Sequence, residues 1–131
     1  MTDAVSSSFQ KQGLMITLGA KLVSVEQGGV VIECPWSEGL TQQHGFFHAG
    51  VLTTIADSAC GYAALTMMPE GREVLTVEFK VNFLRPANTH KIIARGSVVH
   101  SGKTLTVCNG EVFDETGSKL LAKMTATMIT K

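Results

Sequence analysis

The sequence has few charged residues and no excess of either sign. Its 131 residues contain 11 Lys and Arg against 11 Asp and Glu, with a pI near 6.9. A chain without a net positive field does not concentrate nucleic acid or an anionic membrane surface around itself. We therefore expect neither nucleic acid nor a membrane as a partner.

Long apolar runs and paired cysteines are also missing. No stretch approaches the roughly eighteen apolar residues of a membrane-spanning helix, and the first residues, MTDAVSSSFQ, lack the basic and apolar parts of a secretion signal. The cysteines at 34, 60 and 108 offer neither a CxxC zinc pair nor an even disulfide set. These absences indicate a protein of the reducing cytoplasm, with buried free thiols and without a metal or redox cofactor.

The distribution of apolar residues predicts one α+β domain over residues 1–131. Residues 1–7 are expected to fray, and a short helix is predicted over Ser8–Leu18. Two strands then form a hairpin that turns at Gln27-Gly28-Gly29, where glycine supplies the positive φ of the turn. The polar, glycine-containing segment Trp36–Phe47 is predicted to be a loop.

A long buried helix is predicted from His48 to about Met68, because apolar residues recur there every three to four positions on nearly all sides. From Leu75 to Phe83, apolar and polar residues alternate strictly, which predicts a strand with one packed face. The predicted strands are residues 74–87, 91–100, 103–113 and 119–129. A single apolar helix followed by a meander buries itself by lying across the concave face of a curling antiparallel sheet, and we expect that fold.

One carboxylate stands out in the predicted helix. Over residues 39–69, Asp57 is the only side chain with a formal charge when histidine is neutral. It shares a narrow polar stripe with Thr54, Ser58 and Gly61, at three- and four-residue spacing. A buried carboxylate without partners costs several kcal/mol or takes up a proton. Either hydrogen bonds within the helix satisfy Asp57 or a cleft uses it.

The start of the helix favours the second interpretation. The small residues of His48-Ala49-Gly50 leave backbone N–H groups uncovered at the positive end of the helix dipole, where they suit a polarised carbonyl oxygen. Such donors together with a carboxylate suggest acyl transfer. However, Asp57 lies nine residues after His48, roughly 13 Å along the axis at about 1.5 Å per residue. Both can act on one carbonyl only if a symmetric dimer supplies two composite sites.

Three segments, QQHGFFHAGVLTTIADSACGYAA, LTVEFKVNFLRPA and SGKTLTVCNGEVF, resemble a known family. They are similar to the hot-dog-fold acyl-CoA thioesterases, and within these to the PaaI-like branch named for phenylacetate degradation, over residues 15–129. The resemblance implies a hot-dog fold, an antiparallel sheet wrapped around one long central helix. It also implies hydrolysis of a medium-chain or aryl acyl-CoA ester, with coenzyme A as part of the substrate and no cofactor, by a tetramer built from two dimers.

The resemblance assigns roles to individual residues. Asp57 matches the carboxylate that acts as general base on water or as nucleophile on the thioester. His48 and Ala49 match the His-Gly pair whose backbone N–H polarises the carbonyl, although Ala49 replaces the usual glycine. Gln42 stands where the family commonly has an asparagine that orients water or the carboxylate, and the neighbouring Gln43 offers the same amide.

The resemblance also indicates an assisting hydroxyl and a substrate surface. Thr76 stands where relatives often carry a Ser or Thr near the site. Aromatic side chains before the helix are expected to line the acyl pocket, and basic residues near the Arg-Pro corner and the Gly-Lys turn are candidates for holding coenzyme A. The expected substrate-binding residues are Gly50, Phe46, Phe47, Arg85, His100, Gly102 and Lys103.

Two other functions remain open. The chain could be an acyl-CoA-binding module in which Asp57 is only a satisfied helix residue, or a dehydratase of hydroxyacyl thioesters, which would use a His and an acid at a different spacing. His44 and His48 have the spacing of two helical zinc ligands, but Gly45 lies between them and no HExxH glutamate is present. A metal is therefore not expected.

Overall fold

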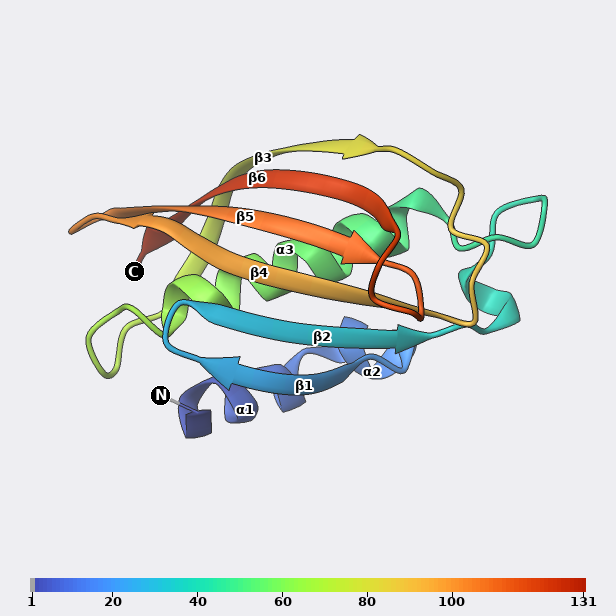
Figure 1. Ribbon diagram of the computed structural model, residues 1–131. Helices are drawn as coiled ribbons and strands as arrows, with labels where there is room; N and C mark the ends of the chain where they lie inside the picture. The colour runs from blue at the N-terminus through green and yellow to red at the C-terminus, as the bar shows by residue number, and fades with distance from the viewer. Residues whose placement is uncertain (1) are drawn as a thin grey trace.

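A six-stranded antiparallel sheet curls around one long helix (Figure 1). The computed structural model describes residues 2–131. The long helix, α3, spans Ala49–Leu65, lies on the concave face of the sheet and contacts five of its strands. A short 3₁₀ helix, η1, spans Glu38–Leu40 in the loop before α3. The predicted fold class is confirmed.

The strands follow the order β1-β2-β4-β5-β6-β3 in the sheet. Their bounds are Lys21–Glu26 for β1, Gly29–Pro35 for β2, Val74–Phe83 for β3, Lys91–Ser101 for β4, Leu105–Phe113 for β5 and Leu120–Thr130 for β6. The first two form the predicted hairpin, with Gly28 at a φ of 79° in the turn. The four predicted strands after the helix all exist, with small differences at their ends.

The prediction that these four strands form a simple meander is wrong for β3. This strand pairs with β6 at the edge of the sheet and not with β4, which follows it in the sequence. The connection over residues 84–90 is not a tight turn. Its backbone accepts hydrogen bonds from Trp36 N at His90 O and from Phe47 N at Ala87 O. These bonds lead the chain to the end of β2, and β4 therefore begins beside β2.

Strand β3 also departs from the predicted strict alternation. Its register with β6 shifts between Thr76 and Glu78, which leaves Val77 in a bulge. Before the bulge, Thr76 lies opposite Met128, which is fully buried. Leu75, which the alternation predicts to be packed, therefore points away from the helix. The bulge turns Thr76 toward α3.

Two helices precede the sheet where one was predicted. Helix α1 spans Thr2–Lys11 and α2 spans Gly13–Leu18, and the helical path breaks at Gln12 between them. Residue 1 of the expected frayed start lies outside the described residues, and residues 2–7 are instead helical, because Val5 and Phe9, one turn apart, are both buried. Helix α1 lies beside β1 and the C-terminal half of α3, whereas α2 lies near the first turns of α3 (Figure 1).

The core lies between α3 and the sheet, where small residues allow a close approach. A Cβ added to Gly96 of β4 would lie 2.3 Å from the backbone carbonyl of Ala59, so the helix rests directly on this strand. A Cβ on Gly110 of β5 would lie 3.0 Å from the Sγ of Cys60. The three cysteines are free and buried, as predicted.

Candidate functional site

The side chain of Asp57 projects from the middle of α3 toward β3 and is half-buried. The hydroxyl of Thr76 donates a hydrogen bond to Asp57 Oδ1 at 2.7 Å. This contact joins two of the residues that the sequence singled out, and it depends on the bulge at Val77 that turns Thr76 toward the helix. One carboxylate oxygen is thus fixed in place, which orients the other.

Two causes act on the acidity of this carboxyl group. Burial raises the pKa of Asp57 above the usual carboxyl value, because the charged form loses solvation, and the hydrogen bond from Thr76 lowers it in part. A carboxylate with a raised pKa holds a proton more strongly and is a better general base near neutral pH. The arrangement suits a carboxylate that takes a proton or attacks an electrophilic carbon.

A cavity of about 260 Å³ lies beside Asp57, between α3, the N-terminal helices and the start of β3. Its lining includes Ser8, Gln12, Ser58 and Tyr62, which are joined by hydrogen bonds. Gln12 Nε2 donates to Tyr62 Oη at 2.8 Å, and Ser58 Oγ donates to Gln12 Oε1 at 3.3 Å. Ser8 Oγ lies 3.1 Å from the same tyrosine oxygen.

Sequence reasoning missed three of these residues. Ser8 and Gln12 are four residues apart, and so are Ser58 and Tyr62, the spacing that places both members of a pair on one side of a helix. This spacing indicates two pairs of polar side chains, each pair on one side of its own helical segment. It could not show that α1 meets α3, because the tertiary structure decides which helices pack together.

The start of α3 is capped by a side chain of its own. His48 Nδ1 accepts a hydrogen bond from Gly50 N at 2.8 Å, and His48 N donates to Leu40 O at 2.9 Å. Among the described residues, the N–H of Ala49 has no acceptor. Ala49 is also exposed. Of the three predicted backbone donors, His48 and Gly50 already donate within the chain, and the N–H of Ala49 is free. The imidazole cap helps to hold this N–H in position.

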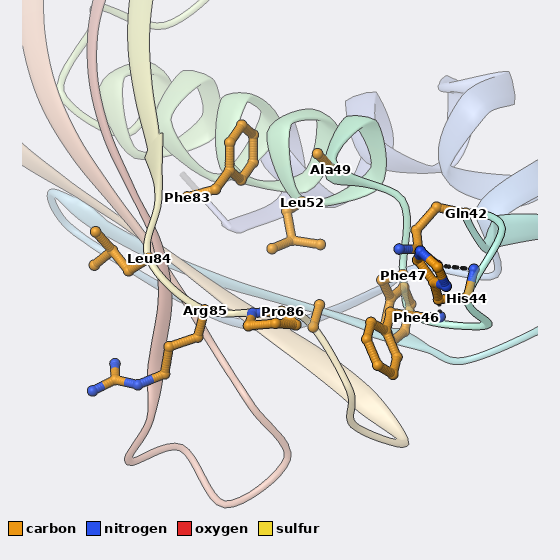
Figure 2. Close-up of a pocket in the computed structure, with 11 residues that line it drawn as sticks. Gln42, His44, Phe46, Phe47, Ala49, Leu52, Phe83, Leu84, Arg85 and Pro86 are labelled. Carbon is orange, nitrogen blue, oxygen red and sulfur yellow. Dashed lines mark hydrogen bonds between the residues drawn. The ribbon is translucent and has the colours of Figure 1, made fainter.

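A second cavity, of about 480 Å³, lies beside Ala49 (Figure 2). It separates the loop before α3 from the end of β3, and Figure 2 shows Ala49 and Leu52 along one side with Phe46 and Phe47 across from Leu84. Most of its lining is apolar. The predicted aromatic residues Phe46 and Phe47 therefore line this cavity and not the smaller one at Asp57.

Gln42 also lines the larger cavity and organises the loop. Its Oε1 accepts hydrogen bonds from His44 N at 2.6 Å and from Phe46 N at 3.2 Å. The carbonyl oxygen of this side chain is thus engaged in folding its own loop. Gln43, the alternative, is exposed.

The basic residues expected to hold coenzyme A lie far apart within one chain. Arg85 lines the larger cavity and donates from Nη1 to Leu120 O at 2.7 Å, at the beginning of β6. The hairpin that carries His100, Gly102 and Lys103 lies at the other end of β6, where Thr130 N donates to Thr104 O. Gly102 closes this hairpin through its N–H to Leu105 O at 2.8 Å. One chain therefore does not gather these residues into one site.

Asp57 and Ala49 also occupy different cavities. They are eight residues apart on one helix, which corresponds to about 12 Å along its axis. Within residues 2–131, no three His, Cys, Asp or Glu side chains converge as a set of metal ligands. None of the described helices combines the length and apolar character needed to cross a membrane.

Comparison with known proteins gives one consistent result. Residues 44–121 match the family model described as the thioesterase superfamily. The chain is 30% identical over 119 residues to the 1,4-dihydroxy-2-naphthoyl-CoA hydrolase of Listeria monocytogenes. The aligned region covers 91% of this chain and 96% of that protein.

Solved structures extend this likeness. The crystal structure of a thioesterase family protein from Silicibacter pomeroyi has 47% sequence identity and a TM-score of 0.93, and the match covers 96% of this chain and 94% of that one. The PaaI protein from the phenylacetic acid degradation operon of E. coli has a TM-score of 0.87 at 22% identity, over 96% of this chain and 89% of that one. At that identity the likeness to PaaI concerns the fold.

Proposed function

Because the chain belongs to the thioesterase superfamily and is a thioester hydrolase, we propose that its substrate is an acyl-CoA ester and that Asp57 is the reacting carboxylate. The observation that carries the proposal is the contact between Asp57 and Thr76, in which a half-buried carboxylate with a raised pKa is held beside a cavity. The Listeria relative is named for a CoA thioester of an aromatic acid. This name supports an aryl acyl group among the substrates that the resemblance implies.

The reaction uses the free oxygen of the carboxylate. Asp57 Oδ2 takes a proton from water as the water oxygen bonds to the thioester carbon, or Oδ2 itself bonds to that carbon and water releases the acid in a second step. In both routes the C–S bond breaks and coenzyme A leaves as a thiolate, which takes up a proton. Thr76 keeps the carboxylate oriented, and its hydrogen bond offsets part of the rise in the Asp57 pKa that burial causes.

The carbonyl oxygen needs a donor while it carries negative charge, and the free N–H of Ala49 is suited to this role. Since Asp57 and Ala49 of one chain lie apart along the helix, the donor is supplied by a second copy. Antiparallel packing of the two α3 helices across a two-fold axis would bring Ala49 of each copy to Asp57 of the other. We propose a dimer with two composite sites.

The edge of the sheet supports this dimer. Strand β3 has one neighbour only, β6, so its other edge offers unpaired backbone groups. Four of its apolar side chains are 43–54% exposed in the single chain, and exposed apolar residues along an unpaired strand favour association. These side chains are Leu75, Val77, Phe79 and Phe83. Pairing of β3 with β3 of a second copy would cover them.

Two substitutions test the composite site. Asp57→Asn removes the reacting carboxylate, and Ala49→Pro removes the proposed donor, because proline has no N–H and is well accepted at the first position of a helix. We expect each variant alone to lose at least about a hundredfold in kcat/KM for thiol release. After subunit exchange, a mixture of the two should recover about one quarter of native activity, because half of the dimers then hold one intact site.

The controls separate this proposal from its alternatives. Ala49→Ser keeps the N–H and should keep most of the activity. A mixture that recovers nothing, although sedimentation shows mixed dimers, would contradict the composite site. Tight binding of acyl-CoA without thiol release by the native protein would instead indicate a binding module, and loss of water from a hydroxyacyl ester without free thiol would indicate a dehydratase.

A further inference from the structure

We propose that Trp36 is a positioning residue, which uses its indole N–H to hold the loop of residues 42–46 in place as one wall of the larger cavity. The inference rests on the proposed function, since the substrate meets the N–H of Ala49 in that cavity. Two observations carry it independently. The tip of the loop depends on the indole for its attachment to the sheet, and open space lies on both sides of that tip.

The base and the interior of this loop are held by its own backbone and by Gln42. Thr41 and Phe47 face each other in an isolated antiparallel bridge that closes the base. Inside the loop, Gln42 N donates to Phe46 O at 2.9 Å, and Gln42 Oε1 accepts from two backbone N–H groups. None of these bonds connects the exposed tip, residues 43–45, to another part of the chain.

Trp36 supplies the missing connection. Its Nε1–H donates to Gly45 O at 3.0 Å, and among the described residues no other hydrogen bond joins residues 43–46 to a segment outside this loop. The backbone of Trp36 is itself fixed at the end of the sheet, because Trp36 N donates to His90 O at 2.8 Å. Trp36 is 43% exposed, although tryptophan is highly buried on average. Its role here is therefore the bond to the loop tip and not core packing.

Gly45 gives the loop tip the backbone shape that this bond requires. Its φ is 84°, in the left-handed region that residues with a side chain adopt only with strain. An added Cβ would meet nothing within 4 Å, so lack of space does not account for the glycine. The turn that presents the Gly45 carbonyl to the indole does account for it.

The loop separates two cavities. On its inner side, His44 and Phe46 line the larger cavity (Figure 2). On its outer side, a third cavity of about 380 Å³ has Trp36, Gly45 and residues 88–90 in its lining. Because packed side chains fill neither space, the tip can move toward either cavity once the indole bond is lost. Any such movement changes the shape of the cavity in which the substrate meets the Ala49 N–H.

Hydrogen exchange tests the hold of Trp36 on the loop without any assay of activity. Trp36 is the only tryptophan of the chain, so a tryptophan analogue alters this one position. Benzothienylalanine keeps the shape of the ring and replaces its N–H by sulfur, whereas fluorotryptophan keeps the N–H and is the matched control. With benzothienylalanine, we expect the amides of His44 and Gly45 to exchange at least about threefold faster. The amide of His48, which donates to Leu40 O, should exchange as in the native protein.

Kinetics then connect the loop to the substrate, with whichever of benzoyl-CoA and hexanoyl-CoA the native protein hydrolyses faster. Loss of the indole N–H should raise KM about three- to tenfold and change kcat by less than about twofold, because Asp57 and Ala49 are untouched. Gly45→Ala should raise KM in the same way, since it strains the turn. Gly39→Ala is its control, because this glycine has no positive φ and an added Cβ meets nothing within 4 Å.

The outcomes distinguish this inference from the proposed function. Native exchange at the loop tip of the benzothienylalanine protein would overturn the hold of Trp36 on the loop. Faster exchange with a native KM, or a loss of kcat together with a lower melting temperature, would overturn the positioning role while hydrolysis at Asp57 stands. Absence of thiol release from both esters by the native protein would overturn the proposed function, and the inference with it.

Discussion

At the scale of single residues, burial and one hydrogen bond act on the pKa of the proposed reacting group. Burial raises the pKa of Asp57 and the bond from Thr76 lowers it, so these two effects oppose each other. The reactive form is the deprotonated one. Activity therefore falls as the pH drops through the pKa of Asp57, at a pH above the value of about 3.9 of an ordinary aspartate.

We predict that Thr76→Val shifts this acid limb of kcat/KM to higher pH. The substitution removes the contact that lowers the pKa and leaves the burial that raises it, so a larger fraction of Asp57 is protonated at a given pH. A pH–rate profile of native and variant measures the shift. Thr76→Ser keeps the hydroxyl and should restore the native limb. A limb that moves to lower pH would contradict the assigned cause.

A second residue-scale prediction concerns stability. Thr106 on β5 is fully buried, and its Oγ1 has no hydrogen-bond partner among the described residues. Replacing it by valine keeps the shape and removes the unsatisfied hydroxyl, so Thr106→Val should raise the free energy of unfolding by about 1–2 kcal/mol. Chemical denaturation measures the change. Thr127→Val is the control and should give no gain, because Thr127 Oγ1 already donates to Glu78 Oε2.

At the scale of secondary-structure elements, the close approach of α3 to β4 depends on Gly96. We predict that Gly96→Ala lowers the free energy of unfolding by about 3 kcal/mol or more, because its Cβ would lie 2.3 Å from the helix backbone and either helix or strand must move. Thermal or chemical denaturation tests this. The neighbouring Ser97→Ala, on the exposed side of the same strand, should change stability by less than about 0.5 kcal/mol.

Two features of the secondary-structure elements could not be predicted from residue patterns, the bulge in β3 and the break between α1 and α2. Strict alternation from Leu75 to Phe83 identified β3, but it assigned Thr76 to the wrong face, because a bulge adds one residue without changing the pattern of residue types. The break between α1 and α2 was missed for a similar reason. Glutamine is not a residue type that ends helices. The chain nevertheless bends at Gln12 between α1 and α2, and the Gln12 side chain contacts Tyr62 of α3 there.

At the scale of the whole molecule, activity should depend on association through β3. We predict that Phe79→Glu yields a monomer in sedimentation experiments and loses at least about a hundredfold in kcat/KM, because the two-fold axis would place two carboxylates in the covered edge. Circular dichroism checks that the fold persists. Val99→Glu alters an exposed apolar side chain on β4 and should leave the oligomer intact. A monomeric Phe79→Glu that retains native turnover would contradict composite sites.

The proposed association would also bring separated site residues together. Arg85 and the hairpin with Lys103 lie at opposite ends of β6 in one chain. Antiparallel pairing of two β3 strands would bring opposite ends of the two sheets toward each other, as proposed for Asp57 and Ala49. The predicted contacts of Arg85, His100 and Lys103 with coenzyme A therefore remain predictions that depend on the dimer.

The sequence by itself determined the fold class and the family. Its periodicity predicted a buried helix and the strands around it, and its motifs resembled the hot-dog thioesterases; the fold and the thioesterase match confirm both. Periodic patterns and motifs are formed by residues close together in the sequence, so both can be recognised without coordinates. It also singled out Asp57, because a lone charge in an apolar helix is visible without coordinates.

Only the tertiary structure decided how these parts meet. It placed β3 at the sheet edge, turned Thr76 onto Asp57 through a bulge, and brought Gln12, from the break between α1 and α2, to the wall of a polar cavity. It also put the predicted aromatic lining at Ala49 and not at Asp57. The first three of these are contacts between segments far apart in sequence. Such contacts depend on register, bulges and the path of connections, which residue types alone do not encode.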